Sequence, residues 1–158
     1  MAGGREFPPH APVVVQLSAM RLIAAAILAL AQSANPQPTS FKARLSPVPV
    51  ETSTAASIKG TGSVIATLNG STLTINGTFE GMKSPATIAQ VHMAPRGVRG
   101  PVEFDLVVDK SPSGTVSGTI KLTTIQIDTL RKGRYYIQIH AEQAPDGNLW
   151  GWLLPAAP

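Results

Sequence analysis

The sequence contains no cysteine, and this absence excludes several classes of chemistry. Disulfide bonds, thiol nucleophiles, zinc–thiolate centres and covalently attached haem all require cysteine side chains. The folded domain must therefore be held together by its hydrophobic core. Of 158 residues, 43% are hydrophobic, which is enough for one domain with a substantial core and too few for two.

Charged and aromatic residues are also scarce, at 14% and 5% of the chain. Thr, Ser, Gly, Val and Ile are abundant instead, and this composition favours short strands and tight turns over long solvent-exposed helices. We interpret the 14 glycines and 14 prolines as turn residues, because their joint share is below that of disordered low-complexity chains. The predicted fold class is all-β.

The net charge of +4 does not by itself indicate a nucleic-acid partner. The basic residues are scattered, and the sequence has no arginine-rich helix and no basic face interleaved with aromatic residues. Only 9 acidic residues are present, with no pairing that suggests a glycosidase cleft. Serine-hydrolase elbows, phosphate-binding loops and dinucleotide fingerprints are absent. We therefore expect neither nucleic-acid binding nor catalysis.

One apolar run, LIAAAILALA, follows Arg21 and leads into the polar stretch QSANPQPTS. A positive residue, a short apolar segment and the small-x-small triplet at 29–31 are typical of a signal peptide. We expect translation to start at Met20, cleavage to follow Ala31, and the mature protein to be secreted or periplasmic. The run is shorter than the roughly 20 residues of a membrane span, so no stable span is expected after cleavage. An uncleaved anchor that also uses residues 13–17 is the alternative.

Residues 1–31 are accordingly assigned to an N-terminal extension and signal peptide. Residues 32–40 are polar and contain proline, so we expect a disordered linker there. The domain is expected at residues 41–154, followed by a short tail at 155–158.

Within the domain, SVIATLNGSTLTINGTF predicts a hairpin with a tight turn at Asn69-Gly70. Asn69-Gly70-Ser71 and Asn76-Gly77-Thr78 both match a glycosylation acceptor pattern, but we interpret both as turn sequences. One helical turn with a glycine cap, or an irregular crossover, is expected in TTIQIDTLRKG. Further strands are predicted at 40–45, 86–93, 102–108, 115–122, 134–141 and 148–154.

The chain resembles the chordin-type (CHRD) domain in four successive segments: FKARLSPVPV, GTGSVIATLNGSTLTINGTFEGM, ATIAQVHMAPRGVRGPVEFDL and LRKGRYYIQIHAEQAPDGNLWGWLL. The most specific parts are the histidine strand leading to Gly100-Pro101, and the Tyr-x-x-x-His strand followed by Pro-x-Gly and Trp-Gly-Trp. The resemblance implies an immunoglobulin-like or superoxide-dismutase-like antiparallel β-sandwich. It implies no definite activity, because the family's biochemical role is mostly unassigned and fold does not confer function.

His92 and His140 are the candidate functional side chains of this domain. Strand residues alternate between faces, so Gln90 lies on the face of His92, while Tyr136 and Gln138 lie on the face of His140. We expect both faces to be exposed to solvent. If the two strands are neighbours, as the dismutase resemblance implies, these side chains converge on one surface site.

Family members commonly carry His-x-His on the first of these strands, similar to the copper-binding strand of Cu/Zn superoxide dismutase, whereas this chain has Gln90-Val91-His92. Two histidines are too few for a copper or zinc centre, so we favour no metal. The simplest role of either histidine is to fix a neighbouring loop, APRGVRGP or AEQAPDGN, by hydrogen bonding. We predict a non-catalytic binding or structural module; the alternative is a copper-binding or dismutase-like protein that uses His92 and His140.

Trp150 and Trp152 extend the candidate site. If His140 lies opposite Trp150 and Gln138 opposite Trp152, both rings share the outward face. With Tyr136 they would form an exposed strip suited to an extracytoplasmic protein, a peptide or a glycan. The alternative is that the rings pack under a loop or in the core.

Arg96 and Arg99 lie in the loop that follows His92. They are candidates for steering an anion toward the polar face, and the alternative is that they keep an exposed loop soluble.

Overall fold

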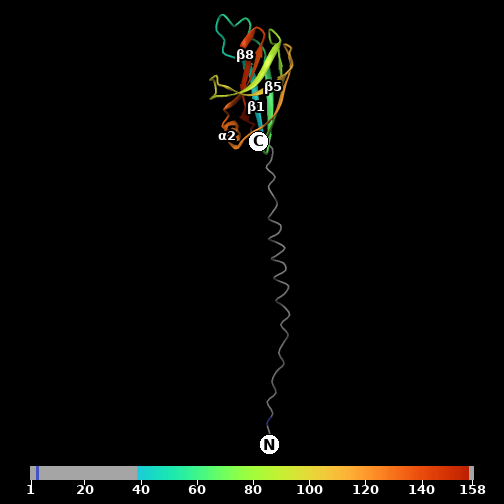
Figure 1. Ribbon diagram of the computed structural model, residues 1–158, viewed down its shortest axis with the longest axis vertical. Coiled ribbons are helices and arrows are strands. Elements are labelled where there is room, and N and C mark those ends of the chain that lie inside the picture. Colours follow the sequence, from blue (N-terminus) through green and yellow to red (C-terminus); the bar gives the residue numbers. More distant parts are fainter. Residues whose placement is uncertain (1–2, 4–38, 157–158) are drawn as a thin grey trace. The chain divides into compact units, whose positions relative to one another are not determined.

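The structure is a computed structural model that describes residue 3 and residues 39–156. The predicted signal peptide, its start and cleavage site, and the linker up to residue 38 lie outside the described residues. In the described part, antiparallel strands surround one core and a single short helix lies at one end (Figure 1). The strands are β1 (Thr39–Pro47), β2 (Thr61–Asn69), β3 (Thr72–Glu80), β4 (Ala86–Met93), β5 (Val102–Val108), β6 (Gly114–Lys121), β7 (Tyr135–Ala141), β8 (Ala144–Trp152) and β9 (Leu154–Pro155), and the helix is α2 (Thr124–Arg131).

The all-β prediction is confirmed, and β4 and β5 have the predicted bounds. The ends of the domain differ slightly from the prediction. Thr39 and Ser40 belong to β1, and Pro155 belongs to β9, which pairs with β1. Among the described residues, no helix is long and apolar enough to span a membrane.

Hydrogen bonding closes eight strands into an antiparallel barrel, in the order β1-β2-β3-β6-β5-β4-β7-β8 and back to β1. This ring differs from the two separate sheets of the predicted sandwich. Two of its junctions are short, because β5–β6 and β1–β8 are each joined at only two residue pairs. These junctions divide the ring into two halves of four strands, β1-β2-β3-β6 and β5-β4-β7-β8.

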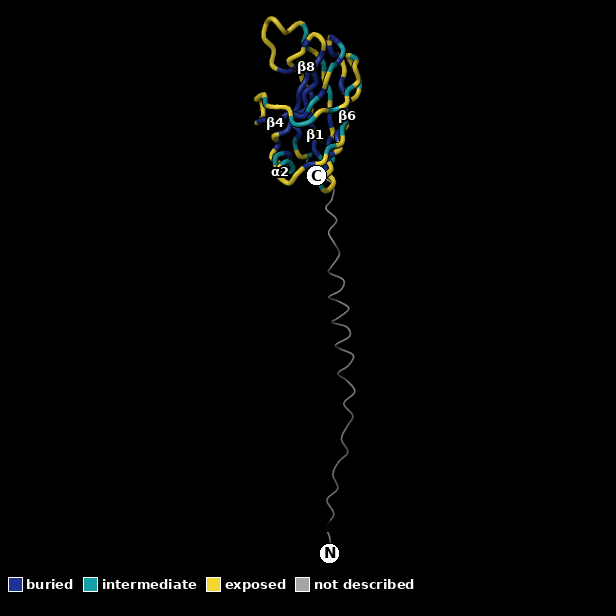
Figure 2. The backbone as a smooth tube through the Cα atoms, in the orientation of Figure 1, coloured by how far each residue is buried: buried dark blue, intermediate teal, exposed yellow. Residues whose placement is uncertain are grey.

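Alternating side chains fill the barrel interior. On β1, Phe41, Ala43 and Leu45 are buried, whereas the residues between them are exposed. The same alternation in β2 and β3 follows from the period of two in an extended strand, and buried and exposed stretches alternate along the tube in Figure 2. β7 is different, because every residue from Tyr135 to Ala141 is buried. Other parts of the protein therefore pack against both the inner and the outer face of β7.

The hairpin between β2 and β3 has the predicted turn. Asn69 pairs with Thr72, and Gly70 has a φ of 59°, a left-handed conformation that glycine adopts without strain. The turn interpretation of Asn76 is wrong, since Asn76 lies within β3 and pairs with Ile65 and Ser117. Asparagine followed by glycine permits a turn but does not require one, and here the alternation of apolar residues continues through the dipeptide.

Helix α2 is longer than the single turn predicted from TTIQIDTLRKG, because Thr123 provides an N-cap. The Thr123 hydroxyl accepts a hydrogen bond from the Gln126 backbone N–H, and the Gln126 side chain accepts one from the Thr123 backbone N–H. The chain leaves the helix at Gly133, whose φ of 64° is that of a glycine cap, as predicted. Leu130 anchors the helix in the core.

Candidate functional site

β7 lies between β4 and β8, and this order brings the predicted site residues together. Gln90 pairs with Gln138 and His92 pairs with Tyr136 across β4–β7. Both strands therefore present these polar side chains on one outer face, as the resemblance to the dismutase fold implied. The His92 and His140 ring centroids are 6.2 Å apart.

The tryptophans also lie on this face, but in a different register from the predicted one. Trp150 pairs with Gln138 and Trp152 with Tyr136, two residues away from the expected partners. The turn lies at Glu142 and Gln143, before the APDGN stretch, so that β8 starts at Ala144. A bulge on β8 between Ala144 and Leu149 then offsets part of this change, and the net shift is two residues. A shift of two residues keeps each side chain on its face, because the strand repeat is also two.

The predicted exposure of this face is wrong. His92, Tyr136, Gln138, His140 and Trp150 are only 1% to 8% exposed. Loops fold over the outer side of the barrel wall and form a second apolar cluster around Tyr136 and Trp150, with Val48 and Ala94 supplied by the loops. Of the predicted binding residues, only Gln90 and Trp152 are partly exposed.

His92 holds the loop that follows β4. Its Nδ1 lies 2.9 Å from the Gly100 carbonyl oxygen, and because a carbonyl only accepts, Nδ1 carries the proton and donates. The Gly100 N–H in turn donates to the Tyr136 hydroxyl at 3.0 Å, and the His92 and Tyr136 rings stack 5.0 Å apart. A Cβ at Gly100 would lie 1.9 Å from the Met93 carbonyl oxygen, so this tight approach requires glycine.

His140 and Gln138 hold the first residues of β8 in the same way. His140 Nδ1 donates to the Pro145 carbonyl oxygen at 2.6 Å. Gln138 Nε2 lies 3.2 Å from His140 Nε2 and 3.1 Å from the Asp146 carbonyl oxygen, and its two hydrogens satisfy both acceptors. The loop APRGVRGP and the start of β8, which falls in the stretch AEQAPDGN expected to be a loop, are thus each fixed by a histidine. This agrees with the simplest role considered from the sequence.

Burial favours the neutral form of His92. Desolvation lowers the pKa of His92 below its ordinary value of 6.5; the hydrogen bond to Gly100 opposes this shift, and the nearby His140 and Arg99 add to it. Its Nε2 lone pair is buried without a hydrogen-bond partner, as is the Gln138 side-chain oxygen.

The side chains of His92, His140 and Gln90 do not provide the ligands of a copper or zinc centre. Among the described residues, no group of three or more His, Asp, Glu or Cys side chains is placed to hold a metal ion. The Gln90 amide nitrogen donates to the Asp105 carboxylate at 2.8 Å, so this side chain is engaged with β5. The His140 Nε2 lone pair is likewise occupied by Gln138.

Arg96 and Arg99 make different contacts, although both lie in the loop after β4. The Arg99 guanidinium donates to the Asp146 carbonyl and so ties the loop after β4 to the start of β8. Arg96 instead lines a groove of about 240 Å³ beside Trp150 and Trp152. We name this hollow the basic groove; its lining includes Lys42, Arg44, Arg96, Trp150, Trp152 and Leu154.

The sequence reasoning missed Lys42 and Arg44. The signal for them is the alternation in FKARL, which places two basic side chains on the outer face of β1 while the apolar residues between them enter the core.

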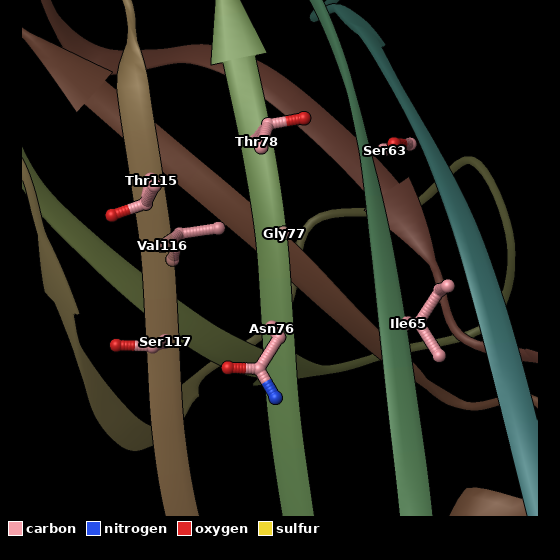
Figure 3. A pocket seen from close by; sticks show the side chains of 8 residues that line it. All are labelled: Ser63, Ile65, Asn76, Gly77, Thr78, Thr115, Val116 and Ser117. Atoms are coloured by element: carbon pink, nitrogen blue, oxygen red, sulfur yellow. The ribbon is translucent and has the colours of Figure 1, made fainter.

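A second hollow of about 540 Å³ lies over β2, β3 and β6 (Figure 3). Two cross-strand rows line it, Ser63–Thr78–Thr115 and Ile65–Asn76–Ser117, with Gly77 between them. It contains hydroxyl and amide groups but no titratable side chain to activate them, so it offers no nucleophile–base pair.

No curated protein and no solved structure shows a significant match to this sequence. The family described as CHRD domain matches residues 41–153, close to the predicted limits and over most of the chain. The chain therefore belongs to the CHRD domain family.

Proposed function

We propose that this CHRD-domain protein is a non-catalytic binding module that acts outside the cytoplasm. One observation carries the non-catalytic part: both site histidines donate through Nδ1 to backbone carbonyls, that of Gly100 in the loop after β4 and that of Pro145 at the start of β8. They hold the loop after β4 and the start of β8 in place, and this is a structural use of imidazole.

Neither histidine is well placed as a general base. His140 Nε2 is occupied by the Gln138 amide, and His92 Nε2 is shielded from solvent. A base must reach the proton that it abstracts, directly or through one water. The cluster therefore supports a rigid platform better than a reaction centre.

Export is proposed from the signal-like pattern between Met20 and Ala31. Mass spectrometry of the protein from the expressing cell tests it, and a mature N-terminus at Gln32 in the extracytoplasmic fraction is the expected result. An intact N-terminus in the cytoplasmic fraction contradicts export.

Copper binding is the competing function, and the buried, unpartnered His92 Nε2 is the observation that favours it. Imidazole NMR decides between the two proposals, because nitrogen shifts report which ring nitrogen carries the proton. We expect the Nδ1–H form in both histidines, unchanged by one equivalent of Zn²⁺ or Cu⁺, together with substoichiometric metal in the purified protein. A stoichiometric metal that shifts the Nε2 signals and is lost in His92→Ala contradicts the proposal.

A further inference from the structure

We propose that the basic groove binds an acidic saccharide, one whose sugar ring carries a carboxylate or a sulfate. This inference rests on the binding function proposed above and adds its site and ligand class. The groove lies on the outer surface where β1 meets β8 and β9, and the loop after β4 closes one side of it through Arg96.

The register of β1 places its cations beside the aromatic rings. Ser46 pairs with Trp150, and Lys42 pairs with Leu154. The same antiparallel register puts Arg44 level with Trp152. Two cationic side chains therefore follow one another along the strand at a spacing of about 7 Å, next to a tryptophan.

The positive charge of the groove is not neutralised by the protein. Lys42, Arg44 and Arg96 are all exposed, and no carboxylate lines the groove. Within residues 39–156 the only ion pair joins Lys132 and Asp128 of the helix region, so none of the three groove cations is paired. Three unpaired cations around one hollow attract an anion, and arginine can bind a carboxylate or sulfate through two parallel hydrogen bonds.

Trp152 supplies a fixed apolar surface beside these charges. Its indole Nε1 donates to the Ala94 carbonyl oxygen at 3.2 Å. Its ring packs against Trp150 and Tyr136, each with a centroid distance of 4.7 Å. Because the ring is already held, little conformational entropy is lost when a ligand packs on it. A flat apolar ring next to cations suits the C–H face of a sugar that also carries an acid group.

The surrounding structure disfavours other polyanions. β1 is hydrogen-bonded to β2 on one side and to β8 and β9 on the other, so an extended peptide finds no free strand edge there. Single-stranded nucleic acid is bound on successive aromatic platforms, whereas this groove has one partly exposed ring, Trp152. The volume of about 240 Å³ is below the range of pockets for drug-sized ligands, and fits a single ring of a longer chain.

Titration of the purified protein with defined oligomers, followed by tryptophan fluorescence and calorimetry, tests the proposal. The probes are an oligomer of galacturonic acid, a sulfated dextran oligomer and neutral oligomers of the same lengths. We expect at least one acidic oligomer to bind and to change the tryptophan emission, with affinity falling as salt rises, and the neutral oligomers not to bind. Which acidic oligomer binds identifies the acid group.

Variants locate the site. Lys42→Gln, Arg44→Gln and Arg96→Gln should each weaken binding roughly tenfold, the loss of one charge-assisted contact. Lys110→Gln removes another exposed cation, beyond the end of β5 and outside the groove lining, and should leave binding unchanged. Equal weakening by Lys110→Gln would show a diffuse charge effect and overturn the proposal.

The other polyanions complete the test. Polyglutamate or oligothymidylate binding more tightly than either acidic saccharide overturns the ligand class, and no binding by any acidic oligomer overturns the site. Neither result bears on the non-catalytic role, which fails only through the metal and tautomer measurements described above.

Discussion

Several individual residues in this domain have roles set by burial. Asn148 is fully buried, and its amide nitrogen donates to the Lys59 carbonyl oxygen at 2.8 Å, holding the long loop after β1 against β8. A buried polar side chain stabilises a fold when its hydrogen bonds are made and costs free energy when they are lost. The buried polar residues His92, His140 and Asn148 therefore hold neighbouring backbone segments in place.

Mild acid should destabilise the protein through His92. Its pKa is lowered in the folded state, so as pH falls through the unfolded value of 6.5 the unfolded chain takes up a proton that the folded chain does not. The protein therefore has its full stability with respect to His92 above this pH. Below it the free energy of unfolding decreases, until His92 is protonated in the folded state as well. Urea unfolding at neutral pH and near pH 5 measures the loss.

His92→Gln is the matched variant, because it removes the titratable ring and keeps an amide donor for Gly100. We expect the variant to be less stable at neutral pH but less sensitive to acid. An unchanged pH dependence would contradict the role of His92 in the acid sensitivity.

Gly147→Ala should be costly. Gly147 has a φ of 125°, and a Cβ there would lie 2.6 Å from Gln138 Nε2. We expect a loss of about 2–3 kcal/mol in the free energy of unfolding, from backbone strain and from displacement of the Gln138 amide. Gly70→Ala is the control. Gly70 also has a positive φ, 59°, but a Cβ added there would meet no other atom. The loss in the free energy of unfolding should therefore be about 1 kcal/mol, from backbone strain alone. Equal losses in the two variants would contradict the proposed contact.

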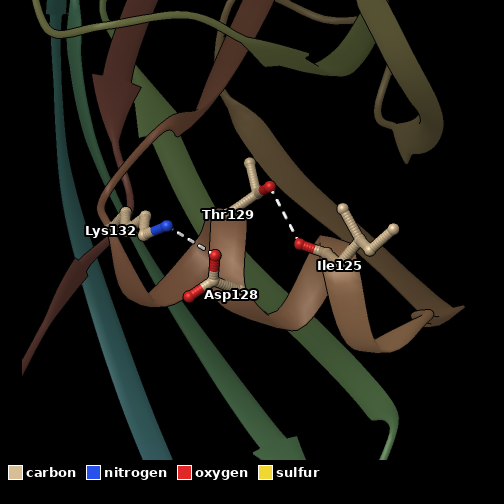
Figure 4. A network of polar contacts seen from close by, with 4 residues as sticks. All are labelled: Ile125, Asp128, Thr129 and Lys132. Atoms are coloured by element: carbon tan, nitrogen blue, oxygen red, sulfur yellow. Dashed lines mark hydrogen bonds and ion pairs between the residues drawn. The ribbon is translucent and has the colours of Figure 1, made fainter.

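Among the elements, α2 illustrates how a short helix is stabilised. It is only 8 residues long, and its own backbone hydrogen bonds would not keep so short a helix folded in isolation. Hydrogen bonds at its ends therefore contribute much of its stability. Figure 4 shows its surface contacts, the Asp128–Lys132 ion pair and the hydrogen bond from the Thr129 hydroxyl to the Ile125 carbonyl. Asp128 and Lys132 are both well exposed, so solvent screens their attraction.

Thr123→Ala should therefore destabilise the protein by about 1 kcal/mol, because it removes the N-cap acceptor. Thr123→Ser should restore most of this loss. Asp128→Ala, which removes only the exposed ion pair, should cost roughly 0–0.5 kcal/mol. Chemical denaturation of the three variants compares them, and a larger loss from Asp128→Ala than from Thr123→Ala would contradict the role of the cap.

At the scale of the whole molecule, the two short junctions are the weak parts of the barrel. β2 and β3 pair over nine residue pairs, whereas β5 and β6 pair only at Val107–Ser117 and Val108–Val116. Val107 is 71% exposed, so only the Val108–Val116 pair of this junction is packed against the core.

Native-state hydrogen exchange should show this difference. We expect the amides of the β5–β6 junction to exchange through local opening, well before those in the middle of β2 and β3, whose exchange requires global unfolding. Uniform protection around the ring would contradict the division into two four-strand halves.

The sequence alone determined the fold class and most strand positions. The alternation in residues 63–79 specified which side chains of β2 and β3 point into the core and which point outward, and Asn69-Gly70 specified the turn between them. Side-chain direction and turn geometry can be predicted because both depend on neighbouring residues. Parity along 86–93 and 135–141 likewise identified the residues that share the outer face. These are local properties, and the structure confirms them.

Only the tertiary structure decided what covers that face and where the ring closes. Whether His92 and Trp150 contact solvent depends on loops that are distant in sequence, such as the segment containing Val48. The grouping of Arg96 with Lys42 and Arg44 depends on β1 pairing with β8 and β9 more than a hundred residues later in the chain. Alternation assigns a side chain to one face of a strand, but burial is set by the packing of non-local segments, and no local pattern encodes it.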